Sequence, residues 1–108
     1  MTVKLLEHLR DELIGCGVVQ NTPEFCRAWL GRSEGYIRTL RNHGTAPSVE
    51  TLTVCSHKLG HYADRLREKG RAEHLRLAEQ FDRLKVLGDG AIARHAEAVW
   101  RAPERMSA

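Results

Sequence analysis

The segment from Thr22 to Gly60 constrains the fold most, because helix starts, turn residues and helix stops follow one another there at short spacing. Thr22, Pro23 and Glu24 are typical of a helix opening, since threonine caps a helix, proline suits its first position and glutamate favours its first turn. Gly31 follows the apolar residues of this helix, and glycine adopts the positive φ of a sharp turn at little cost. We therefore predict a short helix that ends in a tight turn at Gly31.

Ser33 is the predicted N-cap of a second short helix, with Glu34 in its first turn. Ile37 and Leu40 recur at the spacing of one helix face, so we expect both side chains to point inward. Residues 42–47 are rich in turn-forming residues and are predicted to form a loop.

A further helix is predicted to open at Ser48, which follows a proline. Its apolar residues recur at spacings of three, three and four, which places them on one helix face: Val49, Leu52, Cys55 and Leu59. Gly60 is expected to end or interrupt this helix. Two short helices, a tight turn, a loop and a third helix have the spacing of a helix-turn-helix, which presents one helix to the major groove of DNA.

Amphipathic helices are also predicted on both sides of this segment. Residues 3–16 carry apolar residues near positions i, i+3, i+7 and i+10. Residues 61–87 alternate charge with a sparser apolar stripe, which predicts one or two long helices divided at Gly70. The run Gly88-Asp89-Gly90 predicts a clear break before a last short helix over residues 91–100.

The length and composition favour an all-α fold. A chain of 108 residues is long enough for one small domain with a helical appendage. Helix-forming residues dominate and β-branched residues are scattered. We predict a DNA-binding-type unit over residues 1–60, a helical region over residues 61–102 and a loose tail over residues 103–108, after Pro103.

The net charge, the apolar runs and the cysteines indicate the partners and the cellular compartment of the protein. The formal net charge is +3, which is compatible with a nucleic-acid partner without requiring one. No apolar run approaches the length of a membrane span, so we expect a cytoplasmic protein without a membrane partner. Cys16, Cys26 and Cys55 fall at apolar helix positions and are expected to be reduced and buried.

The segment from Thr22 to Gly60 resembles the lambda-repressor-like (Xre-type) helix-turn-helix family. The matching features are the Gly31 turn, Ser33, inward Ile37 and Leu40, Gly44 in the loop, and the run from Pro47 to Gly60. The resemblance implies an all-α, lambda-repressor-like helix-turn-helix bundle with a C-terminal helical extension. It also implies a sequence-specific transcriptional regulator that binds double-stranded DNA.

The resemblance also implies which residues contact DNA. Residues at the start of the second short helix touch base edges in relatives of this type, namely Glu34, Gly35 and Thr39, with Tyr36 and Arg38 beside them. An arginine such as Arg38 suits a bidentate contact to guanine. Phosphate contacts are expected from Thr22, Arg32, Ser33, Arg41, Asn42 and His43.

The region over residues 61–102 has two interpretations: it folds back on its own core, or it pairs with a second chain. One helix-turn-helix reads only a half-site, so we expect a homodimeric repressor on an inverted repeat. The expected interface consists of Tyr62, Leu66, Leu75, Phe81, Leu84 and Trp100. The alternatives are an antitoxin-like adaptor whose C-terminal helices bind a partner, and a protein-interaction module that has lost DNA binding.

The sequence carries no recognisable catalytic or cofactor motif. There is no glycine-rich phosphate loop, no dinucleotide fingerprint and no zinc-protease motif. His57 and His61 stand at i, i+4, but Cys55 lies on a different side of that helix. We therefore expect no enzyme activity, no cofactor, no metal and no small-molecule ligand.

Overall fold

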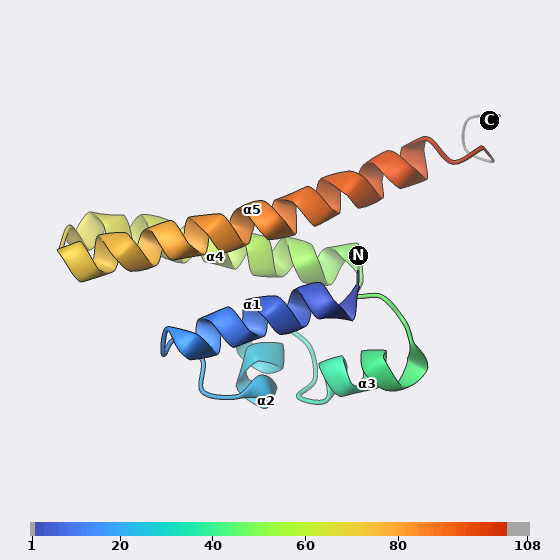
Figure 1. Cartoon of the computed structure of the whole chain (residues 1–108), viewed down its shortest axis with the longest axis horizontal. Coiled ribbons are helices and arrows are strands. Elements are labelled where there is room, and N and C mark those ends of the chain that lie inside the picture. Colours follow the sequence, from blue (N-terminus) through green and yellow to red (C-terminus); the bar gives the residue numbers. More distant parts are fainter. Residues whose placement is uncertain (1, 104–108) are drawn as a thin grey trace.

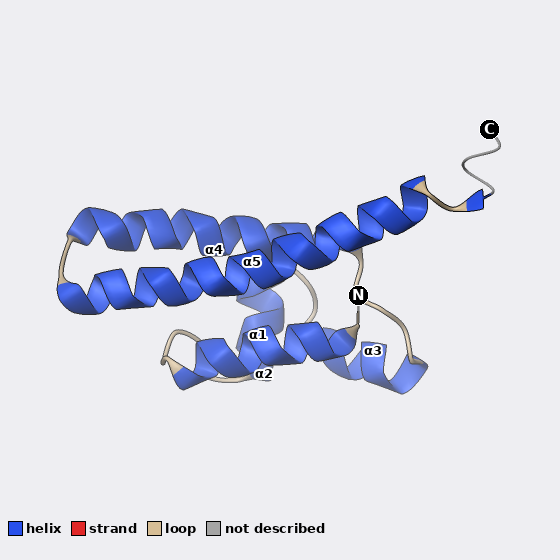
Figure 2. Cartoon of the chain, turned by 45° about the horizontal axis from the view of Figure 1, so that its top comes forward, coloured by secondary structure: helices blue, strands red, loops and turns tan. Residues whose placement is uncertain are grey.

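The computed structural model describes residues 2–103, and every regular element in them is helical (Figures 1 and 2). The predicted all-α class is confirmed. The elements are α1 (Val3–Gly15), α2 (Thr22–Glu24), η1 (Phe25–Trp29), α3 (Tyr36–His43), α4 (Val49–Lys69) and α5 (Ala72–Trp100). The one-turn helix α2 continues directly into η1, a π-helical turn that the sequence pattern did not predict.

The helices form two layers. α4 and α5 make a long antiparallel hairpin, and α1, α2, η1 and α3 lie together on one side of it (Figures 1 and 2). The C-terminal end of α5 extends beyond the start of α4 (Figure 1). The hairpin is therefore the long axis of the molecule, and the short helices are mounted on its side.

The hydrophobic core joins the two layers. The buried face of α1 is formed by Leu6, Leu9 and Leu13, as the periodicity predicts. η1 adds Phe25, Cys26 and Trp29. The hairpin contributes Leu52, Cys55, Leu59, Ala63, Ala78, Phe81, Leu84 and Ala91. Since each fully buried leucine contributes about 1.5–3 kcal/mol, this shared core holds the two halves of the sequence in one unit.

The predicted helix breaks at Gly60 and at residues 88–90 are wrong, because both sites lie inside continuous helices. The two glycines allow the helices of the hairpin to approach closely. A β-carbon on Gly88 would lie 2.2 Å from Oγ of Ser56, and one on Gly60 would lie 2.9 Å from Cε of Lys85. Close packing between α4 and α5 outweighs the helix penalty of a glycine, which is about 1 kcal/mol.

The predicted boundary at residue 60 consequently falls inside α4. α5 folds back on the core of its own chain and buries Phe81 and Leu84 there. Of the predicted tail over residues 103–108, only Pro103 lies among the described residues. α5 ends at Trp100, three residues before that proline, in agreement with the predicted stop.

Two predicted helix caps are also wrong. Asn21, not Thr22, caps α2, and its side chain accepts a hydrogen bond from the backbone N–H of Glu24. The N-cap of α3 is Gly35, not Ser33, so α3 begins at Tyr36. The cap predicted at Ser48 is confirmed, because its Oγ accepts from the N–H of Thr51.

Candidate nucleic-acid interface

A sharp turn separates η1 from α3. Gly31 adopts a φ of +67°, which an L side chain rarely adopts, so the predicted role of this glycine is confirmed. The backbone N–H of Arg32 then donates to the carbonyl of Cys26, which closes the turn. Residues 33–35 lead into α3 outside any helix. Glu34 and Gly35 therefore lie in the connection between η1 and α3, and not in the first helical turn of α3.

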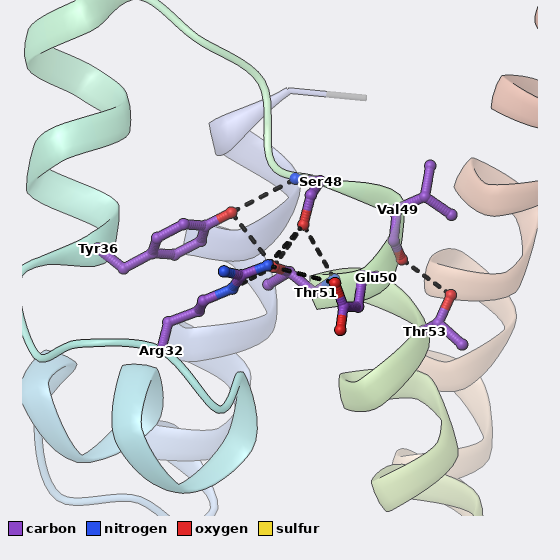
Figure 3. A network of polar contacts seen from close by, with 7 residues as sticks. All are labelled: Arg32, Tyr36, Ser48, Val49, Glu50, Thr51 and Thr53. Carbon is purple, nitrogen blue, oxygen red and sulfur yellow. Dashed lines mark hydrogen bonds and ion pairs between the residues drawn. The ribbon is translucent and has the colours of Figure 1, made fainter.

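A polar network ties this turn to the start of α4 (Figure 3). Arg32 Nε donates to Oγ1 of Thr51 at 2.9 Å, and its Nη2 donates to Oγ of Ser48 at 3.1 Å. The hydroxyl of Tyr36 lies 3.3 Å from Oγ1 of Thr51 and accepts from the N–H of Ser48 at 3.4 Å. Glu50 lies at the edge of the network, with its Oε2 3.9 Å from Nη2 of Arg32.

This network assigns Arg32 and Tyr36 a structural role that the sequence did not predict. Both side chains reach toward α4, where Thr51 is buried (Figure 3). A buried hydroxyl costs free energy unless it is hydrogen-bonded, and Arg32, Tyr36 and Ser48 supply its partners. The network fixes how α3 sits relative to the hairpin, which leaves Arg32 and Tyr36 poorly placed for the predicted DNA contacts.

α3 has one buried face and one exposed face. Ile37 and Leu40 are buried, as the spacing predicts. Arg38, Thr39 and Asn42 are exposed. The helix thus presents a short row of polar side chains to solvent, while two apolar residues anchor it.

Gly35 provides space for Arg38. A β-carbon at Gly35 would lie 3.0 Å from Nη2 of Arg38, so the guanidinium lies directly over this glycine. Within residues 2–103, no carboxylate lies within 4.0 Å of the Arg38 guanidinium. Arg38 therefore carries an unpaired positive charge on the exposed side of α3.

Two other cations near α3 are paired with carboxylates. Arg27 Nη1 lies 2.8 Å from Oε1 of Glu34, and Arg41 Nε lies 3.3 Å from Oε2 of Glu7. Both arginines are largely exposed, so these pairs are worth little stability. They nevertheless reduce the net positive charge of the surface. Arg41 has five N–H donors, so it can contact a phosphate while it stays paired with Glu7.

A depression lies between α1 and α3. Its walls include Glu7, Arg10, Thr22, Arg38, Arg41 and Asn42. Arg10 Nη1 donates to Oγ1 of Thr22 at 3.4 Å. Glu7 and Arg10 were not predicted from the sequence, because they belong to α1, distant in sequence from the other residues. Thr22, Arg38, Arg41 and Asn42 are brought together here, whereas Ser33 and His43 are exposed elsewhere.

A protein-family model matches residues 6–101 of the chain. The chain belongs to DUF6626, a family of unknown function. The match covers α1 from Leu6 onward, the other short helices and the whole hairpin. No curated protein and no solved structure matches the chain.

The predicted dimer residues of this DUF6626 chain fall into three groups: exposed, buried and partly buried. Tyr62, Leu75 and Trp100 are exposed, and the exposed fraction of Trp100 is 64%. Phe81 and Leu84 are only 2% and 4% exposed, because they pack into the core of their own chain. Their assignment to an intermolecular interface is therefore corrected, since they have almost no surface left for a second copy. The sixth residue, Leu66, is partly buried against the core.

The cysteines of the DUF6626 chain are free thiols, and Cys26 and Cys55 are buried as predicted, whereas Cys16 is only half-buried. Burial raises the pKa of Cys55 to about 12, although the nearby Lys58 lowers it somewhat. A protonated thiol is a poor nucleophile, so Cys55 acts as a small apolar core residue. His57 and His61 are exposed while Cys55 points inward.

Residues 2–103 contain no group of three or more His, Cys, Asp or Glu side chains placed to hold a metal ion. In the same residues, no helix combines the length and the apolar character that crossing a membrane requires.

Proposed function

We propose that the protein is a sequence-specific DNA-binding transcriptional regulator that reads duplex DNA through α3. The observation that carries the proposal is the position of α3. It follows a tight turn at Gly31, is anchored by Ile37 and Leu40, and presents polar side chains to solvent. This arrangement supports a lambda-repressor-like helix-turn-helix, in which the second helix enters the major groove.

The side chains on α3 suit two kinds of contact. Arg38 has no acidic partner and is the main candidate for a bidentate contact to guanine. Thr39 is exposed beside it and suits a thymine methyl group or a base edge. Thr22, Arg41 and Asn42 line the adjacent depression and suit phosphate oxygens.

We propose that the protein acts as a homodimer on an inverted repeat, most simply as a repressor that occupies its site. A single module contacts one half-site, so a two-fold dimer doubles the contacts. Exposed apolar side chains on α5 support a dimer surface, among them Leu75 and Trp100.

A second candidate function is protein binding by the C-terminal part of α5. This part extends beyond α4 and exposes Val99 and Trp100 (Figure 1). An exposed tryptophan at the end of a helix is typical of a protein-binding surface. In this case, the protein is an adaptor and its DNA binding is secondary or lost.

Selection of bound sequences from a random duplex library tests the first proposal. We expect a recovered palindrome, and affinity for it that falls as salt concentration rises. Arg38→Ala should weaken binding to that duplex about 5- to 150-fold, which corresponds to about 1–3 kcal/mol for a bidentate base contact. Arg76→Ala is the matched control, because Arg76 is an exposed arginine on α5, outside the α1–α3 depression.

Two results would overturn the proposal. The first is a failure to enrich any sequence at low salt with a folded protein. The second is equal affinity of wild type and Arg38→Ala for the enriched duplex, which would show that α3 is not the reading helix. Co-purification of a partner that Trp100→Ala abolishes, without enrichment of DNA, would favour the adaptor.

A further inference from the structure

An apolar pocket opens between η1 and the α4–α5 hairpin. Its volume is about 270 Å³, and its walls include Trp29, Lys58, Tyr62, Leu66, Leu77 and Phe81. Ligand pockets in proteins usually measure about 300–1,000 Å³, so this one lies just below that range and suits only a very small ligand. Apolar side chains dominate the walls, and Lys58 is the one charged residue among those named.

The aromatic walls of the pocket are held in place by their own contacts. The rings of Trp29 and Phe81 meet edge to face, with centroids 5.8 Å apart and an interplanar angle of 83°. The ring of Tyr62 also lies 5.8 Å from that of Trp29, centroid to centroid. Tyr62 belongs to α4, whereas Phe81 belongs to α5. Trp29 and Phe81 are almost fully buried, whereas Tyr62 is 42% exposed. The pocket therefore has a fixed aromatic interior and a more accessible edge.

Lys58 brings a positive charge to this pocket. Its Nζ lies 5.0 Å from the ring centroid of Trp29 and 5.8 Å from that of Tyr62. It also donates a hydrogen bond to the carbonyl of Ala28. Among the residues that the structure describes, no carboxylate lies within 4.0 Å of Lys58. An ammonium group has three N–H donors, so two remain for another acceptor.

We propose that this pocket binds a small organic carboxylate with a flat, apolar body. The apolar body packs against the accessible parts of Tyr62, Leu66 and Leu77, over the buried rings of Trp29 and Phe81. The carboxylate accepts charge-assisted hydrogen bonds from Lys58. The charge of Lys58 selects an anion over a neutral or cationic molecule of the same shape. This binding site is separate from the exposed face of α3 and does not depend on DNA binding.

Titration with three probes of similar shape tests the proposal on the full chain. The probes are phenylacetate, the neutral phenylacetamide and the cationic phenethylamine. The readout is the indole N–H resonance of Trp29, distinguished from that of Trp100 by the Trp100→Phe variant. We expect phenylacetate to bind at least tenfold more tightly than either other probe, and to raise the melting temperature at saturating concentration.

Variants of Lys58 test the origin of this selectivity. Lys58→Met keeps the length of the side chain without its charge, so it should reduce the preference for phenylacetate over phenylacetamide to less than threefold. Lys58→Arg should retain the preference. Lys69→Met is the matched control, because Lys69 is an exposed lysine at the end of α4 and outside the pocket.

Three titration results with folded protein overturn the proposal. One is no shift of the Trp29 resonance at millimolar phenylacetate. Another is equal affinity for the three probes. The last is a Trp29 response that Lys58→Met leaves unchanged. If Trp100→Phe alone shifts the Trp29 resonance and dissociates a dimer, the pocket is filled by a second copy of the chain, which also overturns the proposal.

Discussion

Different interactions hold α3 in place and pack α4 against α5. The hairpin packs two long helices closely through small residues such as Gly60, Ala63 and Gly88, with apolar side chains alongside. α3 is a short helix held by two buried residues and by the polar network around Thr51. The hairpin therefore depends on close apolar packing, and the polar network positions a helix whose other face stays free.

The largest effect is expected from a charge placed where the two regions share their core. Leu52→Asp buries an unpaired carboxylate at a fully buried position, which costs several kcal/mol. We expect the whole domain to unfold, including α3, as measured by circular dichroism and thermal melting. Thr53→Asp is the control, since residue 53 is exposed on the same helix. A normal melting curve for Leu52→Asp would contradict its place in the core.

A second prediction tests whether the close approach of α4 and α5 requires a glycine at residue 88. Gly88→Ala places a methyl group 2.2 Å from Oγ of Ser56, so the helices or the serine must shift. We expect a loss of about 1–2 kcal/mol in the free energy of unfolding, as for other overpacked cores. Denaturant unfolding measures the change.

Two variants serve as controls for Gly88→Ala. Ser56→Ala in the same chain should recover most of the loss, because it removes the clashing oxygen. Gly90→Ala should have the opposite sign and stabilise the protein by about 0.5–1 kcal/mol, because the nearest atom to its new methyl group is the flexible end of Arg94. Equal effects of Gly88→Ala and Gly90→Ala would refute the packing argument.

The third prediction concerns the polar network that positions α3. Tyr36→Phe removes the hydroxyl that contacts Thr51 and Ser48. We expect a loss of about 1 kcal/mol in the free energy of unfolding, the usual net value of a hydrogen bond. Arg38→Ala should leave stability within about 0.5 kcal/mol of wild type, because Arg38 is an exposed surface residue. If Tyr36→Phe lowers DNA affinity without changing stability, Tyr36 contacts DNA directly.

The smallest effect is a dependence of stability on alkaline pH. The pKa of Cys55 is about 12 in the folded chain, above its ordinary value of 9.0. The unfolded chain therefore loses this proton first, and the contribution of Cys55 to stability is complete below pH 9 and is lost as pH rises toward 12. Between pH 8 and pH 10, wild type should lose about 1 kcal/mol more than Cys55→Ala. Parallel pH profiles of the two proteins would exclude this role for the thiol.

The sequence predicted much of the local structure of the candidate site. The positive φ of Gly31, the inward Ile37 and Leu40, and the cap at Ser48 all follow from residue type and spacing. The structural roles of Arg32 and Tyr36 could not be predicted in this way. Their partners lie 12 to 19 residues further along the chain, beyond the range of any helical periodicity.

The aromatic pocket could not be predicted from residue type and spacing either. Its walls come from η1, α4 and α5, and no local motif joins Trp29, Lys58 and Phe81. In the sequence, each of these residues is an ordinary member of an amphipathic pattern. Only the fold brings a lysine without a carboxylate partner next to two buried aromatic rings.

By itself, the sequence determined that the chain is helical, where the tight turn lies, and which faces of the first four predicted helices are apolar. Those properties depend on interactions within a few residues, which residue type and periodicity express directly. The tertiary structure alone decided that α4 and α5 run unbroken through their glycines and that Phe81 and Leu84 are buried within their own chain. The reason is that a glycine in a helix costs only about 1 kcal/mol, which close packing against a distant helix readily outweighs.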